Sequence, residues 1–174
     1  MRNGERGERA GLTERAEKRG YDMTIMSDDA LWTTYANTVL RIGPRRQLKV
    51  DLRQPLSDEM RRLLTEFGPA GTFAIITPFN PGGRRAHAWV NQWRYLRLRA
   101  RLASSGRRFV DADGESPDAS HRERGFAIAT GRGEAAVLAR ELEQLALYWF
   151  DGDAFWVDAV LEQRPPQRLP SARE

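Results

Sequence analysis

A short polar segment, Asp118-Ala119-Ser120-His121-Arg122-Glu123, places a histidine between carboxylates. In an extended chain, His121 and Glu123 point to the same side, because side chains alternate along a strand. A carboxylate beside an imidazole orients the ring and raises its pKa, as a general base requires. We therefore take His121 and Glu123 as candidate catalytic residues, and the nearby Asp118 as a candidate ligand-binding residue.

The same segment has other interpretations. Asp118, His121 and Glu123 could ligate a divalent metal, but one histidine without thiolates is a poor zinc signature, and we assign no metal site. The ordinary alternative is a solvated loop in which His121 and Glu123 pair with arginines. No nucleophile elbow is present, so a Ser–His–Asp triad is not supported.

A second polar segment, Phe79-Asn80-Pro81-Gly82-Gly83-Arg84-Arg85, directly follows an apolar run. Glycines allow close approach to the backbone, and Arg84 and Arg85 supply positive charge before a helix. This combination predicts an anion cradle with Asn80, Arg84, Arg85 and, in the following helix, Asn91 as ligand-binding residues. The segment matches neither a Walker A motif nor a dinucleotide fingerprint, and it assigns no cofactor. The alternative is an ordinary turn in which Asn80 binds its own backbone.

The apolar run before this loop, Phe73 to Thr77, organises the fold prediction. It is apolar or β-branched without alternation, which predicts a central strand buried on both faces. Prolines and glycines then end the strand. If the strand that begins at Gly125 runs antiparallel to it, segments 79–85 and 116–124 meet. A small anionic ligand would then bind between them.

Caps, turns and hydrophobic periodicity predict the remaining elements. Together they indicate an α+β fold: one compact domain with a mixed β-sheet, a buried central strand flanked by helices, and a C-terminal β-hairpin. The predicted elements are a helix from Ser27 to about Ala36, strands at 38–42 and 48–53, a helix capped by Ser57, the central strand at about 72–78, a helix at about 86–103, a short strand at 109–110, a polar loop at 111–124, a strand at 125–130, a helix at about 134–144 and a hairpin at 147–157.

The helix at about 86–103 carries both aromatic and basic residues. Helical spacing groups four apolar residues, which we expect to pack in the core: Trp89, Trp93, Leu96 and Ala100. Three arginines lie on another face: Arg94, Arg97 and Arg101. The alternative is that Trp89 and Trp93, with Trp149 and Trp156, form a stacking platform beside the arginines, as in proteins that bind single-stranded nucleic acid.

The charge of the chain is concentrated in its tails. Residues 1–20 contain six basic and four acidic groups, and residues 163–174 contain three arginines and one glutamate, which together account for the net charge of +4. We expect a disordered basic tail at 1–20, a single α+β domain at 21–162 and a flexible Pro/Arg-rich tail at 163–174. Arginine outnumbers lysine 26 to 2, which resembles the codon bias of a GC-rich genome more than selection for phosphate binding.

Within the body, the segment 84–108 has eight arginines and no carboxylate, whereas 109–162 has twelve carboxylates and four arginines. We expect these regions to face each other within the fold or across a dimer. The alternative is a non-catalytic interaction module that uses the arginine-rich helix 84–108 to bind nucleic acid or an acidic protein. Nucleic acid is the less expected partner.

The composition also limits location. No apolar run approaches about 18 residues, so we expect no membrane-spanning segment and no secretion signal. The chain has no cysteine, which excludes disulfides and thiolate metal sites. The expected location is the cytoplasm.

Several stretches together resemble one bacterial family. They are Phe73-Ala74-Ile75-Ile76-Thr77-x-Phe79-Asn80-Pro81-Gly82, Asn91, Ser116-Pro117-Asp118-x-Ser120-His121-x-Glu123-x-Gly125-Phe126-Ala127, Gln144-x-Ala146 and Trp149-Phe150-Asp151-Gly152. In order and spacing the set resembles the family of domain of unknown function 3293, over roughly residues 30–160. The resemblance implies a compact bacterial domain, and it implies no activity.

Overall fold

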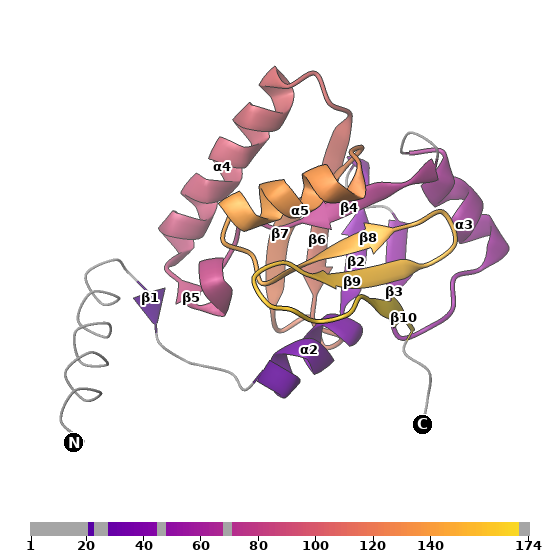
Figure 1. Cartoon of the computed structure of the whole chain (residues 1–174), viewed down its shortest axis with the longest axis horizontal. Helices are drawn as coiled ribbons and strands as arrows, with labels where there is room; N and C mark the ends of the chain where they lie inside the picture. Colours follow the sequence, from indigo (N-terminus) through magenta and orange to yellow (C-terminus); the bar gives the residue numbers. More distant parts are fainter. Residues whose placement is uncertain (1–20, 23–27, 45–47, 68–70, 171–174) are drawn as a thin grey trace.

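An eight-stranded antiparallel sheet, strongly curled into a half-barrel, organises the chain (Figure 1). The computed structural model describes residues 21–22, 28–44, 48–67 and 71–170. Along the sheet the strands are β10 (Gln167–Leu169), β9 (Phe155–Ala159), β8 (Ala146–Phe150), β4 (Phe73–Ile76), β7 (Arg122–Ile128), β6 (Phe109–Glu115), β2 (Val39–Ile42) and β3 (Leu48–Asp51).

Four helices and a small separate ladder complete the described elements. The helices are α2 (Asp28–Ala36), α3 (Asp58–Thr65), α4 (Ala88–Ser104) and α5 (Arg132–Glu141). A short 3₁₀ turn, η3 (Pro81–Gly83), precedes β5 (Arg85–Ala86), which pairs with β1 (Tyr21–Asp22). The predicted N-cap of α3 is confirmed, because the Met60 N–H donates to Ser57 Oγ at 3.1 Å.

The central strand is confirmed. β4 lies between β8 and β7, and all four of its side chains are buried. Phe73 and Ile75 pack in a core that includes residues of α2 and α3. Ala74 and Ile76 pack in a second core with α4 and α5. Helices therefore cover both faces of the sheet, and β4 connects the two cores.

Two predictions about the sheet need correction. Every strand pairing among the described residues is antiparallel, including those of β4 with its two neighbours. The sheet is therefore not mixed. The predicted polar loop 111–124 is in fact the hairpin of β6 and β7. Its polar side chains pair across the strands on one face, as in the bond from Arg122 Nε to Asp113 Oδ2 at 2.6 Å. An apolar run is therefore not required for strand formation here.

The sheet extends beyond residue 162, the predicted C-terminal end of the domain. The β8–β9 hairpin is present as predicted, but the sheet continues into β10, which pairs with β9. Leu169 is buried in the first core, so the predicted flexible tail at 163–174 contains an ordered strand. The predicted tail at 1–20 lies outside the described residues.

The orientation of α4 is opposite to the prediction. Trp89, Trp93 and Leu96, expected in the core, are 71%, 52% and 52% exposed. The helix instead faces the sheet with Val90, Asn91, Tyr95, Leu98 and Leu102. Both faces of the helix carry apolar residues at helical spacing, so periodicity alone does not select the buried face.

Part of the segregated charge is paired within the fold. Three arginines of the segment 84–108 pair with glutamates of the acidic part of the chain. The pairs are Arg94–Glu143 at 3.6 Å, Arg101–Glu141 at 2.5 Å and Arg107–Glu134 at 3.2 Å. Across the ranges that the structure describes, no helix is both long and apolar enough to cross a bilayer.

Candidate functional site

The site is positioned by the close contact between β4 and β7. The two strands are antiparallel, so the end of β4 lies beside the start of β7. Thr77 Oγ1 donates to the Arg124 carbonyl at 2.9 Å, just beyond the ladder. A Cβ atom at Gly125 would lie 2.5 Å from the Ile76 carbonyl oxygen. Because glycine has no Cβ, β4 and β7 can lie close together here. This close contact holds the loop after β4 beside the first residues of β7.

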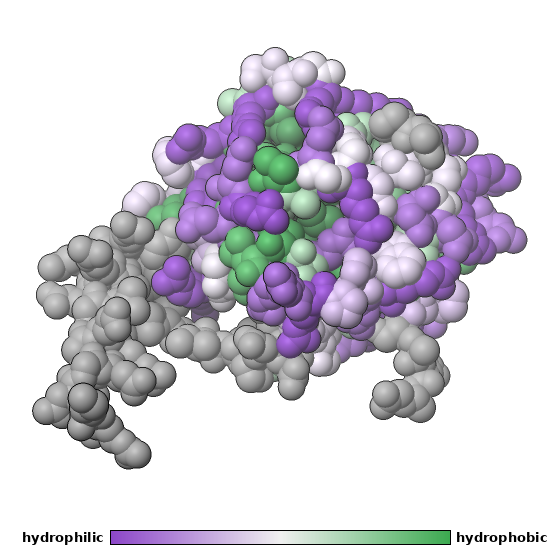
Figure 2. All heavy atoms as spheres, viewed as in Figure 1, coloured by the Kyte–Doolittle hydropathy of each residue, from purple (hydrophilic) through white to green (hydrophobic). Residues whose placement is uncertain are grey.

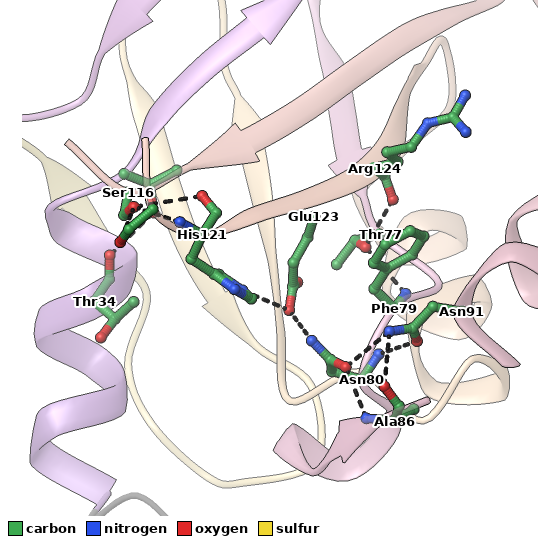
Figure 3. A network of polar contacts seen from close by, with 12 residues as sticks. Thr34, Thr77, Phe79, Asn80, Ala86, Asn91, Ser116, His121, Glu123 and Arg124 are labelled. Carbon is green, nitrogen blue, oxygen red and sulfur yellow. Dashed lines mark hydrogen bonds and ion pairs between the residues drawn. The ribbon is translucent and has the colours of Figure 1, made fainter. Parts of the chain in front are cut away.

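Asn80 and Asn91 clamp this loop onto α4 (Figure 3). The Asn80 N–H donates to Asn91 Oδ1 at 2.9 Å, and Asn91 Nδ2 donates to Asn80 Oδ1 at 3.0 Å. The Ala86 N–H also donates to Asn80 Oδ1, at 3.0 Å. Asn80 has φ of 48°, a left-handed conformation that asparagine tolerates better than most residues. These bonds stabilise the loop, but the Asn80 side chain contacts the backbone of Ala86 and the side chain of Asn91, not its own backbone as the ordinary interpretation predicted.

Two further residues hold the same loop: Gln144, which follows α5, and Arg94, which lies in α4. Gln144 Nε2 donates to the Phe79 carbonyl at 2.9 Å, and Arg94 Nε donates to the Pro78 carbonyl at 2.7 Å. Gln144 is buried. Gln144 could have been found from its place in the family motif. Arg94 could not, because the amphipathic pattern placed it on an outer face of the helix.

Glu123 connects this clamp to His121 (Figure 3). Asn80 Nδ2 donates to Glu123 Oε1, and His121 Nε2 lies 3.3 Å from the same oxygen. The side chains of His121 and Glu123 are 60% and 26% exposed, respectively. The structure thus brings Asn80, Asn91, His121 and Glu123, which come from two separate segments, into one polar network.

The network favours the protonated form of His121. Its hydrogen bond to Glu123 raises the pKa of the imidazole above 6.5, while partial burial and the charge of Arg85 act in the opposite direction. Within the described part of the chain, the other ring nitrogen, Nδ1, has no hydrogen-bond partner. One nitrogen is therefore held by Glu123, in a side chain that is largely exposed.

Two tyrosines of the first core, the half-buried Tyr35 and the buried Tyr148, are affected by the charge of the same carboxylate. Burial raises the pKa of Tyr35 and of Tyr148, and the charge of Glu123 adds to both shifts. The Tyr148 hydroxyl donates to the Tyr35 carbonyl at 3.0 Å. Both phenols therefore stay neutral and border the site without adding charge. Sequence reasoning missed them because their segments carry no polar motif.

The remaining predicted residues lie at the margin of the network. Asp118 Oδ1 accepts bonds from the Ser116 and Ser120 hydroxyls at 2.6 and 2.8 Å, which lower its pKa to about 2. Asp118 thus closes the β6–β7 turn, away from Asn80. Arg84 folds its guanidinium over Gly82. Arg85 is exposed in β5, near enough for its charge to lower the pKa of His121.

Chemically, the arrangement offers an oriented imidazole, a carboxylate and an arginine at an exposed position. Among the described residues, no group of three or more histidine, cysteine or acidic side chains is placed to hold a metal ion. An imidazole that is held by a carboxylate is a type of group that donates to anions and transfers protons in proteins.

A comparison with protein families finds one match. Residues 76–147 match the model of the family described as Protein of unknown function (DUF3293). This confirms the predicted resemblance, over a shorter span than the expected 30–160, and the matched span includes all four residues of the network. Comparisons with curated proteins and with solved structures found no match.

Proposed function

For this chain, whose residues 76–147 match the DUF3293 family, we propose that the function is to bind a small anionic ligand at His121 and Arg85. The observation that supports this most directly is the exposed imidazole with one nitrogen held by Glu123 and the other open. A carboxylate or phosphate oxygen would accept a hydrogen bond from Nδ1 of the imidazolium.

Arg85 supports the choice of an anion. Its charge opposes protonation of His121, so an anion that contacts both cations would relieve their repulsion. Glu123 also carries negative charge, but His121 and Asn80 already bind its Oε1. The ligand is small in this proposal, because the Asn80 loop and the β6–β7 turn border the site on two sides.

The His121–Glu123 pair is also suited to proton transfer, since Glu123 holds the ring in one orientation. His121 would act as base only in its neutral form, whereas it binds the anion as imidazolium. In a reaction, an arginine would hold developing negative charge. We assign ligand binding to the pair, with His121 as its proton-handling group and Glu123 as its positioning residue.

The test uses inorganic phosphate and acetate as probes on the full chain. The protein has two histidines, so NMR of the imidazole signals distinguishes His121 from His87. Either probe should shift the His121 signals, and His121→Ala or Arg85→Gln should weaken binding about tenfold or more.

His87→Ala is the matched control, because His87 is exposed and makes no side-chain cap bond at the start of α4. It should leave anion binding unchanged. Shifts that follow His87, or affinity that survives His121→Ala, would reject the proposed site.

A further inference from the structure

The outer face of α4 carries an apolar stripe that is exposed to solvent. We define the α4 stripe as Trp89, Trp93, Leu96 and Ala100, which are spaced four, three and four residues apart and therefore lie on one face. The first three are 71%, 52% and 52% exposed. Figure 2 shows a face covered mainly by hydrophilic side chains, with its largest hydrophobic area in the middle and smaller hydrophobic areas nearer the edge.

In the described part of the chain, this stripe is not the face that α4 packs against the sheet. α4 is attached to the sheet through its opposite face, where Tyr95 stacks on Phe126 with ring centroids 4.7 Å apart. Two exposed tryptophans and a leucine leave a few hundred Å² of mainly apolar surface in water. Patches of this size on a folded protein commonly mark an interaction site.

Positive charge borders the stripe on both sides. At 100° per residue, Arg97 lies on one side of the stripe and Arg99 on the other. The Arg97 guanidinium lies 4.6 Å from the centroid of the Trp93 ring, which restrains that ring. Arg99 has no ion-pair partner in the described ranges, and α4 contains no acidic residue.

We propose that the α4 stripe docks an acidic amphipathic helix of another protein. Such a helix presents an apolar stripe with carboxylates along both of its edges, which matches the stripe and its two arginines in shape and charge. The binding surface lies opposite Asn91, so this function is separate from anion binding at His121.

The charges argue against other occupants. A second copy of the chain would bring the arginines of two α4 helices together. The segments 1–20 and 163–174 each carry a net charge of +2, so they also repel this surface. A single nucleic-acid strand carries its phosphates along one edge of its stacked bases and would use one of the two arginines.

The experiment measures binding of the full chain to a labelled designed peptide of about 20 residues, long enough to form a helix. The peptide carries leucines at helical spacing with glutamates on both sides. Trp89→Ala and Trp93→Ala should each weaken binding roughly 30-fold, as expected for residues at the centre of an interface. The double variant Arg97→Gln and Arg99→Gln should weaken it and reduce its salt dependence.

Leu63→Ala is the control, since Leu63 is an apolar residue of α3 that is 40% exposed. It should leave peptide binding unchanged, and all these variants should keep the melting temperature of the parent chain. Equal binding of a peptide with lysines in place of glutamates would overturn the proposal. So would absence of peptide binding, a large stability loss in Trp93→Ala, or tighter binding of oligo-dT through the same tryptophans.

Discussion

The two ends of the polar network differ in what their side chains are free to do. At one end, Asn91 is 7% exposed and its amide is bonded to the Asn80 loop. At the other end, the side chain of His121 is 60% exposed and makes one side-chain bond, to Glu123. Glu123 belongs to both ends. One carboxylate thus connects a buried structural clamp to an exposed titratable group.

This difference leads to a ranking of mutational effects. Changes at the buried end should cost stability, because buried polar groups that lose their partners keep the penalty of leaving water. Changes at the exposed end should alter charge and ligand binding with little loss of stability. Four substitutions test the ranking.

The largest effect is expected from Gly125→Ala, at the strand contact that positions the whole network. Its Cβ would lie 2.5 Å from a backbone oxygen of Ile76, so the strands must separate. The free energy of unfolding should fall by about 3 kcal/mol or more, measured by urea denaturation. In Gly133→Ala, where a Cβ meets nothing within 4 Å in the first turn of α5, stability should be unchanged or slightly higher. Similar losses in both variants would contradict the steric account.

Asn91→Ala should have the next largest effect. It leaves the N–H of the half-buried Asn80 without its acceptor and removes the reciprocal bond to Asn80 Oδ1. The expected loss in the free energy of unfolding is about 2–3 kcal/mol. The neighbouring Gln92 is exposed, and Gln92→Ala should stay within about 0.5 kcal/mol of the parent. If Asn91→Ala lowers the free energy of unfolding no more than Gln92→Ala does, the clamp does not stabilise the fold.

Glu123→Gln separates the two functions of the shared residue. An amide oxygen can still accept from Asn80, so the loss of stability should be only about 1 kcal/mol. The negative charge is lost, however, and the pKa of His121 should fall towards its ordinary value of 6.5. An NMR titration of the imidazole measures this shift. An unchanged pKa would mean that Glu123 does not control the protonation of His121.

The smallest effect is the pH dependence contributed by His121. Its pKa is raised in the folded protein, so its stabilising contribution is complete below about pH 6.5 and disappears as the pH rises through the folded pKa. The difference in unfolding free energy between the parent and His121→Ala should stay below about 1 kcal/mol, because the pair is exposed. Urea denaturation between pH 5 and 9 tests this. A difference that grows with rising pH would reverse the sign and contradict the assignment.

Much of the local structure could be predicted from the sequence because it depends on neighbouring residues. The unbroken apolar run at Phe73–Ile76 indicated a strand buried on both faces, and Ser57 with its acidic neighbours indicated the start of α3. The alternation of side chains placed His121 and Glu123 on one side of the chain, and the structure has them in contact. Their assignment as a binding or catalytic pair remains a prediction.

Other features depend on contacts between distant segments. The amphipathic pattern of α4 has two apolar faces, and only the shape of the sheet determined that Tyr95 and Leu98 are buried while Trp89 and Trp93 are not. The half of the β6–β7 hairpin nearest its turn is formed largely by charged residues, whose strand character depends on pairing across the ladder. Leu169 similarly becomes part of the core only because β10 pairs with β9.

Side-chain type, caps, turns and periodicity act over a few residues, so the order of amino acids shows which residues can do chemistry and which segments have strong local preferences. The packing of distant segments establishes which of those residues already have partners. Asn80 and Asn91 use their polar groups on each other and on Glu123, whereas His121 keeps one nitrogen open. The physical reason is that a hydrogen-bonding group has limited capacity, and packing determines whether a neighbouring residue or a ligand will occupy it.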